Sequence, residues 1–291
     1  MTGPRLDLAL QAAGLARSRS HARRIIEEGR ARVDGREARK PSTPVPAGAE
    51  LTVIDVPDGI EYASRSAHKL LGALERTGVD PQGLRCLDAG ASTGGFTDVL
   101  LRRGAATVIA VDIGHDQLVA HVREDPRVRV LDGTSIRGLR SEQLGGAVDL
   151  AVADLSFISL RTVMPSLAQV VRPDGELLLM VKPQFEVGRE ALPRTGVVTD
   201  PEQQRSAVQA VAEVAGRAGL ALRGVGPSPL PGQDGNREYF LHLRRTGVTC
   251  ALGTSAYDMI ESALRDALPG GTSTSRTARH APSPNQEDTR G

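Results

Sequence analysis

The sequence predicts an α/β protein: a doubly wound, largely parallel sheet with a small α+β domain in front of it. Three observations predict this fold. Short apolar segments alternate with helical segments after residue 67, a Gly-rich turn joins the first of these strands to a helix, and a basic excess is confined to the first 40 residues. Such alternation is typical of parallel strands joined by crossover helices.

Composition limits the classes of protein to which the chain can belong. With 291 residues, of which 40% are hydrophobic and 24% charged, the chain can form a full α/β domain and a smaller one. Cys86 and Cys250 lie far apart, so neither a disulfide framework nor a metal site is expected. No signal-peptide pattern and no apolar run of about 20 residues is present. We therefore expect a reduced, cytoplasmic protein without a membrane segment.

The small domain is predicted over residues 1–58. Leu6–Leu15 indicates one short helix, and Ser18 resembles the N-cap of a second helix that ends at Gly29. Asp34-Gly35 predicts the turn of a small hairpin, and Leu51–Val56 predicts a closing strand.

The basic excess lies in this domain. Between Met1 and Lys40 ten Lys and Arg face five Asp and Glu, although the net charge of the whole chain is only +1. A local excess of this kind suits a phosphate-rich partner, and an ordinary solvated helix is about equally compatible with it.

Residues 59–66 are predicted to form a linker and residues 67–268 the larger domain. Its predicted strands and long helices are Arg85–Asp88, Thr97–Arg103 (helix), Thr107–Asp112, Val128–Leu131, Val148–Ala153, Glu176–Val181, Pro201–Gly219 (helix), Leu222–Val225 and Glu238–Leu243. The tail 269–291 is rich in Gly, Ser, Thr, Arg and Pro and is expected to be disordered.

A cofactor site is predicted where the first strand of the sheet runs through Gly90 into a helix. Glycines there let the backbone approach a ligand at the carboxyl end of a strand, and an acid ending the next strand can bind ribose hydroxyls. The pyrophosphate fingerprint is absent, and an acid before the glycines suits a cationic sulfonium, so S-adenosylmethionine is favoured over NAD. The predicted cofactor residues are Asp88, Gly90, Ser92, Thr93, Gly94, Gly95, Phe96, Asp112 and Asp154.

Four charged residues at the ends of predicted elements form the candidate catalytic set: Lys69, Asp154, Lys182 and Glu238. Each alone could be a solvated strand end, but the carboxyl ends of parallel strands line one crevice. A lysine whose pKa is lowered by a neighbouring ammonium can remove the proton of a hydroxyl group. Methyl transfer to that hydroxyl then needs placement, and no metal ion.

These segments resemble the TlyA family of rRNA 2′-O-methyltransferases. The similarity runs through Ser64–Leu70, Leu87–Thr97, Asp154–Leu160, Val181–Glu186 and Glu238–Leu241. The resemblance implies an FtsJ-like, Rossmann-like methyltransferase domain, with its lysine–aspartate–lysine–glutamate tetrad on the four residues above, and an S4 RNA-binding domain in front. It also implies an rRNA cytidine as substrate, in one or both ribosomal subunits, a C-terminal helix near Tyr257–Leu268, and a monomer.

Residues that would contact RNA follow from the basic segment and from this resemblance. They are Arg5, Arg17, Arg19, Arg23, Lys40, Arg65 and Phe157. Phe157 would stack on a flipped base, and packing under the sheet edge is its competing interpretation.

Two other functions compete with the enzyme. An RNA chaperone with a vestigial methyltransferase fold would explain the basic segment, but the glycine turn and the four charged residues are all intact. A membrane-damaging hemolysin has only the older label of the family in its favour, since the sequence offers no membrane-inserting segment.

Overall fold

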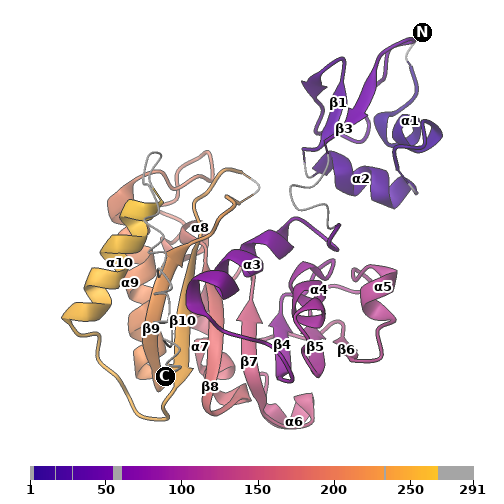
Figure 1. Cartoon of the computed structure of the whole chain (residues 1–291). Coiled ribbons are helices and arrows are strands. Elements are labelled where there is room, and N and C mark those ends of the chain that lie inside the picture. The colour runs from indigo at the N-terminus through magenta and orange to yellow at the C-terminus, as the bar shows by residue number, and fades with distance from the viewer. Residues whose placement is uncertain (1–2, 17, 28, 55–60, 233, 268–291) are drawn as a thin grey trace, which may run out of the picture.

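The computed structural model describes every residue except 1–2, 17, 28, 55–60, 233 and 268–291. It contains a small N-terminal domain, at the top right of Figure 1, and a larger α/β domain below it. Two predictions lie outside the described residues: the RNA contact of Arg17 and the tail 269–291. The predicted strand Leu51–Val56 is described only as far as residue 54. No helix among the described residues has the length and apolarity needed to cross a bilayer.

The N-terminal domain packs two helices against a three-stranded antiparallel sheet of order β2-β1-β3. Its elements are α1 (Leu6–Ala12), α2 (Arg19–Glu27), β1 (Ala31–Val33), β2 (Arg36–Glu37) and β3 (Leu51–Val53). Leu10 and Ile26 are fully buried between these layers. The backbone N–H of His21 donates to Ser18 Oγ at 3.1 Å, which is the cap expected at the start of the second helix. The predicted order of elements in this domain is confirmed.

The larger domain is built on a seven-stranded sheet of order β6-β5-β4-β7-β8-β10-β9. The strands are β4 (Arg85–Ala89), β5 (Thr107–Val111), β6 (Val128–Leu131), β7 (Val148–Ala153), β8 (Val171–Val181), β9 (Leu220–Pro227) and β10 (Tyr239–Arg245). The five strands from β6 to β8 are parallel, and β10 is antiparallel to both β8 and β9. The predicted doubly wound, largely parallel sheet is confirmed.

Helices cover both faces of this sheet (Figure 1). They are α3 (Ser66–Thr77), α4 (Gly95–Arg102), α5 (Ala120–Arg123), α6 (Ser141–Leu144), α7 (Leu160–Val170), α8 (Pro183–Glu186), α9 (Pro201–Arg217) and α10 (Thr254–Asp266). Successive strand residues enter different cores: Leu150 packs with the α3 and α4 residues, and Ala151 packs with those of α7 and α9. Strands buried on both faces explain the continuous apolar runs in the sequence.

The structure differs from the predicted elements in several respects. Helix α3 and the short helices α5, α6 and α8 were not predicted. Helix α7 was not expected, because Pro165 lies inside it and proline usually ends a helix; its face of Leu160, Val163, Met164 and Leu167 is buried nonetheless. Strand β8 begins at Val171, five residues before the predicted Glu176. The early start was missed because the first residues of the strand are mostly polar and show no apolar pattern.

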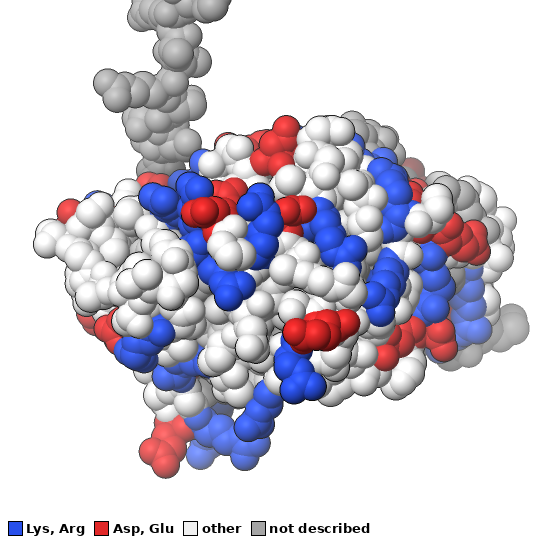
Figure 2. Space-filling view, turned by 90° about the horizontal axis from the view of Figure 1, so that it is seen from below, with Lys and Arg blue, Asp and Glu red and all other residues white. Residues whose placement is uncertain are grey.

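The topology decides which loops can form a site. The carboxyl ends of β4, β5, β7 and β8 meet at one edge of the sheet, and antiparallel β10 begins at that edge. The opposite edge, seen from below in Figure 2, carries basic and acidic side chains side by side. Two of its arginines are paired with acids, Arg172 with Asp149 at 2.6 Å and Arg244 with Asp174 at 3.3 Å.

Candidate active site

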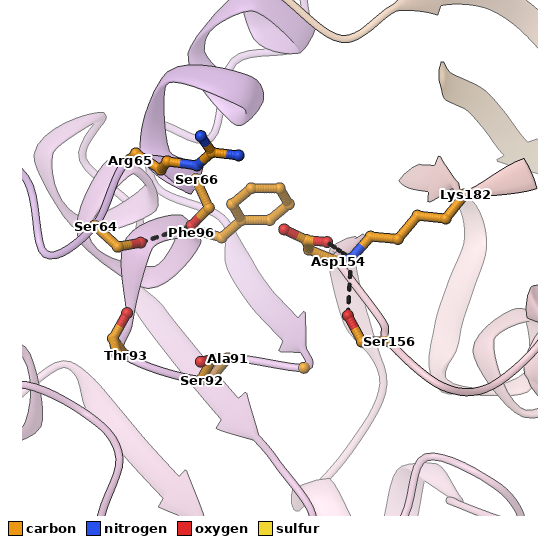
Figure 3. A pocket seen from close by; sticks show the side chains of 11 residues that line it. Ser64, Arg65, Ser66, Ala91, Ser92, Thr93, Phe96, Asp154, Ser156 and Lys182 are labelled. Carbon is orange, nitrogen blue, oxygen red and sulfur yellow. Dashed lines mark hydrogen bonds and ion pairs between the residues drawn. The ribbon is translucent and has the colours of Figure 1, made fainter. Parts of the chain in front are cut away.

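A polar cavity of about 200 Å³ lies at the carboxyl edge of the sheet. It is lined by Ser64, Arg65, Ser66, Gly90, Ala91, Ser92, Thr93, Phe96, Asp154, Ser156 and Lys182 (Figure 3). The lining therefore combines the β4–α4 turn, the ends of β7 and β8, and the segment that enters α3. Six of the predicted cofactor and catalytic residues are among these: Gly90, Ser92, Thr93, Phe96, Asp154 and Lys182.

The glycine turn leaves no room for side chains. Gly90 has φ +84°, and a Cβ there would lie 2.9 Å from the Asp154 carbonyl oxygen. Gly94 has φ +98° and closely approaches Leu118. A Cβ on Gly95 would lie 2.2 Å from Ser66 Oγ, so this glycine lets the entry to α3 pack on the turn. Gly94 and Gly95 thus shape the cavity without lining it.

Asp88 lies on β4, two residues before the cavity-lining Gly90, and is fully buried. Thr97 Oγ1 donates to its Oδ2 at 2.7 Å, while Oδ1 has no hydrogen-bond partner among the described residues. Burial raises the pKa of Asp88 to about 7, the Thr97 hydrogen bond lowers it, and the nearby Asp154 charge raises it further. A buried carboxylate with an unpaired oxygen fits a cationic ligand above it, as S-adenosylmethionine would be.

Asp112 follows β5 and organises the neighbouring loops. Its Oδ2 accepts the backbone N–H of Ser92, and its Oδ1 accepts that of Gly114, both at 2.8 Å. The carboxylate therefore ties the glycine turn to the loop after β5. It does not line the cavity among the residues described, and its expected contact with a ribose stays a prediction.

Lys182 and Asp154 form an ion pair at the inner end of the cavity. Lys182 Nζ lies 2.7 Å from Asp154 Oδ1, at angles outside hydrogen-bond geometry, and donates to Ser156 Oγ at 2.9 Å. Both side chains come from adjacent parallel strands, which explains why residues 28 positions apart meet. Figure 3 shows the Lys182 amine directed toward Asp154 across the cavity.

Lys69 and Glu238 form a second pair, which is buried. Lys69 Nζ lies 2.5 Å from Glu238 Oε2, and both residues are almost inaccessible. Glu238 directly precedes β10, whose Tyr239 is in register with Val181 of β8, so Glu238 lies beside Lys182 at the same edge. The four charged residues thus gather at one edge of the sheet as two ion pairs, of which the Lys182–Asp154 pair reaches the cavity.

Two predicted RNA contacts lie near the cavity. Arg65 lines its mouth and donates to the Pro231 carbonyl at 2.9 Å. Phe157 is 93% exposed with φ +64°, and its ring lies 5.5 Å from that of Phe185. The competing interpretation of Phe157 as packed under the sheet edge is wrong, because the ring is in solvent.

The remaining predicted RNA contacts lie in the N-terminal domain. Arg5, Arg19 and Arg23 surround one carboxylate, that of Asp7. Lys40 is exposed and directly precedes Pro41, whose carbonyl accepts the backbone N–H of Asp7 at 3.2 Å. Four of these basic residues therefore lie close together, while Arg17 lies outside the described residues.

Four lining residues were not predicted: Ala91 and three serines, Ser64, Ser66 and Ser156. Ser64 Oγ and Ser66 Oγ lie 2.8 Å apart. The sequence carried a signal for the serines, because two of them flank Arg65 where α3 begins and Ser156 follows Asp154 by two residues. Among the described residues, no group of three or more His, Cys, Asp or Glu could hold a metal ion.

Comparison with known proteins identifies the family of the chain. The FtsJ-like methyltransferase model matches residues 62–245, and the S4 domain model matches residues 4–51. The chain is 52% identical over 240 residues to the 16S/23S rRNA (cytidine-2′-O)-methyltransferase TlyA of Mycobacterium tuberculosis, which covers 82% of this chain and 89% of that protein. It is 32% identical over 240 residues to Hemolysin A of Brachyspira hyodysenteriae, covering 82% of this chain and 99% of that one.

A solved structure agrees with these matches. A candidate hemolysin from Streptococcus thermophilus superimposes with a TM-score of 0.70 and is 33% identical, covering 90% of this chain and 96% of that one. The chain therefore belongs to the FtsJ-like methyltransferase family, together with the TlyA proteins, and carries an S4 domain ahead of the methyltransferase domain.

Proposed function

We propose that the protein is an S-adenosylmethionine-dependent rRNA (cytidine-2′-O)-methyltransferase that acts within ribosomal subunits. One observation carries the proposal: the amine of Lys182, next to Asp154, enters a cavity that the glycine turn of the family's cofactor site also lines. The 52% identity to a relative named for this activity supports it.

The residues present suggest how the reaction is divided among them. When bound, the cofactor supplies an electrophilic methyl group on its sulfonium. In its neutral form, Lys182 is placed to accept the proton of the ribose 2′-hydroxyl and so become an ammonium, and Asp154 and Ser156 hold its nitrogen at 2.7 and 2.9 Å. The Lys69–Glu238 pair is buried behind this amine and fixes the edge of the sheet. Since Lys69 does not line the cavity, Lys182 is the better candidate for the base.

Substrate binding is assigned to two separate surfaces. The arginines around Asp7 and Lys40 would contact rRNA phosphates, and the exposed ring of Phe157 would stack on the flipped target base beside Lys182. The opposite edge of the sheet, seen in Figure 2, is a weaker candidate for binding rRNA, because arginines there are neutralised by neighbouring acids.

Domain limits, ribosomal subunit, oligomeric state and location in the cell are part of the same proposal. The domain limits 1–58, 59–66 and 67–268, the use of both ribosomal subunits, and a monomeric state are proposed with it. An rRNA substrate would place the reaction in the cytoplasm.

The decisive experiment replaces Lys182. We expect Lys182→Met to lower methyl transfer to ribosomal subunits at least about 1000-fold, because the general base and its positioning are both lost, while the Kd for S-adenosylmethionine changes less than threefold. Ribose methylation would be mapped by primer extension at limiting nucleotide. Full activity of this variant would refute the assigned base, and a chain that binds subunits but no cofactor by calorimetry would support the chaperone alternative.

A further inference from the structure

A buried carboxylate joins three arginines at the surface of the N-terminal domain. The Asp7 side chain is fully inaccessible, whereas the side chains of its arginine partners are 43–50% exposed. Arg5 Nε lies 3.0 Å from Asp7 Oδ1, Arg19 Nε lies 3.0 Å from Oδ2, and Arg23 Nε lies 3.5 Å from Oδ2.

The arginines come from two different parts of the chain. Arg5 directly precedes α1, whereas Arg19 and Arg23 lie on α2 and one turn of helix apart. The backbone N–H of Leu8 also donates to Asp7 Oδ1, at 3.1 Å. Asp7, in the first turn of α1, therefore links this helix to α2 through Arg19 and Arg23.

The contacts use one side of each guanidinium. Arg19 and Arg23 approach Asp7 through Nε, and their contacts with it do not involve the terminal Nη groups. With half of each side chain exposed, N–H donors remain available to solvent. Guanidinium donors on one surface match the oxygens of a phosphate.

The surroundings of Asp7 favour its ionised form. Hydrogen bonding from Arg5, opposed by burial and reinforced by Arg19, holds the pKa of Asp7 well below its usual range. Three arginines around one ionised aspartate leave a net excess of two positive charges. A buried charge of this kind gives no general gain in stability over an apolar residue, so a role in arranging its partners accounts for it better.

We propose that Asp7 is the positioning residue of the RNA-binding surface, holding Arg5, Arg19 and Arg23 together as one phosphate-binding unit. The inference rests on the proposed rRNA-binding function of this domain and adds to it the residue that organises the contacts. Lys40 extends the unit, because Pro41 pairs with the backbone of Asp7.

The proposal predicts the sign of a charge-changing substitution. Asp7→Asn removes one negative charge and so raises the net charge of the domain by one. If charge alone mattered, RNA would bind more tightly and the affinity would depend more steeply on salt. If Asp7 positions the arginines, binding instead weakens, because flexible arginines lose phosphate contacts. We expect the Kd for bacterial ribosomal subunits lacking the ribose methyl group to rise about tenfold, and the slope of log affinity against log salt to fall by about 1.

The experiment measures binding and catalysis with the full chain. Subunit Kd would be measured between 50 and 300 mM KCl, together with kcat, KM and the Kd for S-adenosylmethionine. The expected pattern is a tenfold higher KM for subunits, kcat within twofold at saturation and an unchanged cofactor Kd. Asp174→Asn is the matched control. It makes the same charge change at a carboxylate that pairs with Arg244 in the larger domain, at the edge of the sheet away from the cavity.

A double-mutant cycle separates positioning from folding. With Arg5, Arg19 and Arg23 all replaced by Gln, nothing remains for Asp7 to position, so adding Asp7→Asn should change subunit Kd less than twofold. Arg19→Lys provides a second variant should Asp7→Asn unfold the domain. It keeps the charge and the helix but loses the Nε contact with Asp7, and we expect a three- to fivefold weaker Kd.

The outcomes distinguish the inference from the function on which it rests. Unchanged or tighter binding by Asp7→Asn, with weak binding by the triple Gln variant, would overturn the positioning role and leave the RNA surface intact. A lower melting temperature for Asp7→Asn with unchanged binding by Arg19→Lys would also overturn it. Normal binding by the triple Gln variant would refute the RNA surface itself.

Discussion

At the scale of single residues, we expect Asp88 to make cofactor binding depend on pH. Its pKa is raised to about 7, chiefly by burial, so the carboxyl is mostly protonated at pH 6 in the free protein. A cation in the cavity favours the ionised form. Cofactor affinity should therefore rise about five- to tenfold from pH 6 to pH 7.5, and binding at pH 6 should release a proton. Calorimetry in two buffers of different ionisation enthalpy would measure both.

Folding stability should show the opposite trend at the same residue. Because the folded pKa lies above the unfolded value, this group favours the folded state at low pH, and that contribution is lost as the pH rises through about 7. Asp88→Asn removes the titrating group and should abolish both trends. If cofactor affinity in the Asn variant rises with pH as in the unmodified protein, the effect belongs to another group.

Phe157 is a residue at which we expect a substitution to affect activity without affecting stability. The ring is 93% exposed on a backbone with φ +64°, a conformation that favours glycine over aromatic residues. Phe157→Gly should therefore change the melting temperature by less than about 2 °C. Loss of base stacking should lower kcat/KM for subunits about 10- to 100-fold, with an unchanged cofactor Kd. Phe157→Tyr keeps a ring and should stay near full activity; equal activity of the Gly variant would exclude stacking.

At the scale of elements, the contact between α3 and the glycine turn shows what sequence reasoning could and could not supply. The β4–α4 turn was predicted because glycines and a strand pattern are local features. The packing of α3 on that turn is a long-range contact, and Ser64 and Ser66 were missed for this reason. Helix α7 was missed because the internal Pro165 contradicted its apolar spacing.

The same contact gives a prediction for Gly95→Ala. The added Cβ would lie 2.2 Å from Ser66 Oγ and 2.3 Å from Ser64 Oγ, so these two cavity-lining hydroxyl groups must shift. We expect the cofactor Kd to rise at least about tenfold, since the cradle loses its fit, while the melting temperature falls by only a few degrees. Gly253→Ala, at a glycine with open space around its Cα, is the control. Unchanged cofactor affinity in Gly95→Ala would show that the serines move freely.

At the scale of the whole molecule, the sequence predicted two domains but could not predict how they meet. The order of elements follows from hydrophobic periodicity and turn residues, which are local. The gathering of Lys69 and Glu238, 169 positions apart, follows from sheet order, which the resemblance to a known family suggested and periodicity did not. The joint between the domains had no local pattern, because it depends on contacts between residues far apart in the sequence, among them Arg24 with the Ala63 carbonyl and a linker carboxylate with its partners.

That carboxylate is Glu61. Its Oε1 lies 2.5 Å from His21 Nε2 and 3.1 Å from Arg24 Nη2, both on α2 of the N-terminal domain. Its backbone carbonyl accepts from Arg102 Nη2, on α4, at 3.2 Å. One residue thus contacts α2 of the N-terminal domain with its side chain and α4 of the larger domain with its backbone.

Glu61→Gln should loosen this joint without altering either domain. Hydrogen bonds to charged groups contribute about 1.5–3 kcal/mol, and partial exposure of Glu61 reduces the gain, so we expect a KM for subunits about fivefold higher with an unchanged cofactor Kd. Rotational diffusion of the two domains, measured by NMR relaxation, should become more independent. Glu213→Gln, which removes an exposed partner of Arg217 on α9, is the matched control. If the domains still tumble as one body and KM is unchanged, Glu61 does not set their orientation, and other contacts must hold the two domains together.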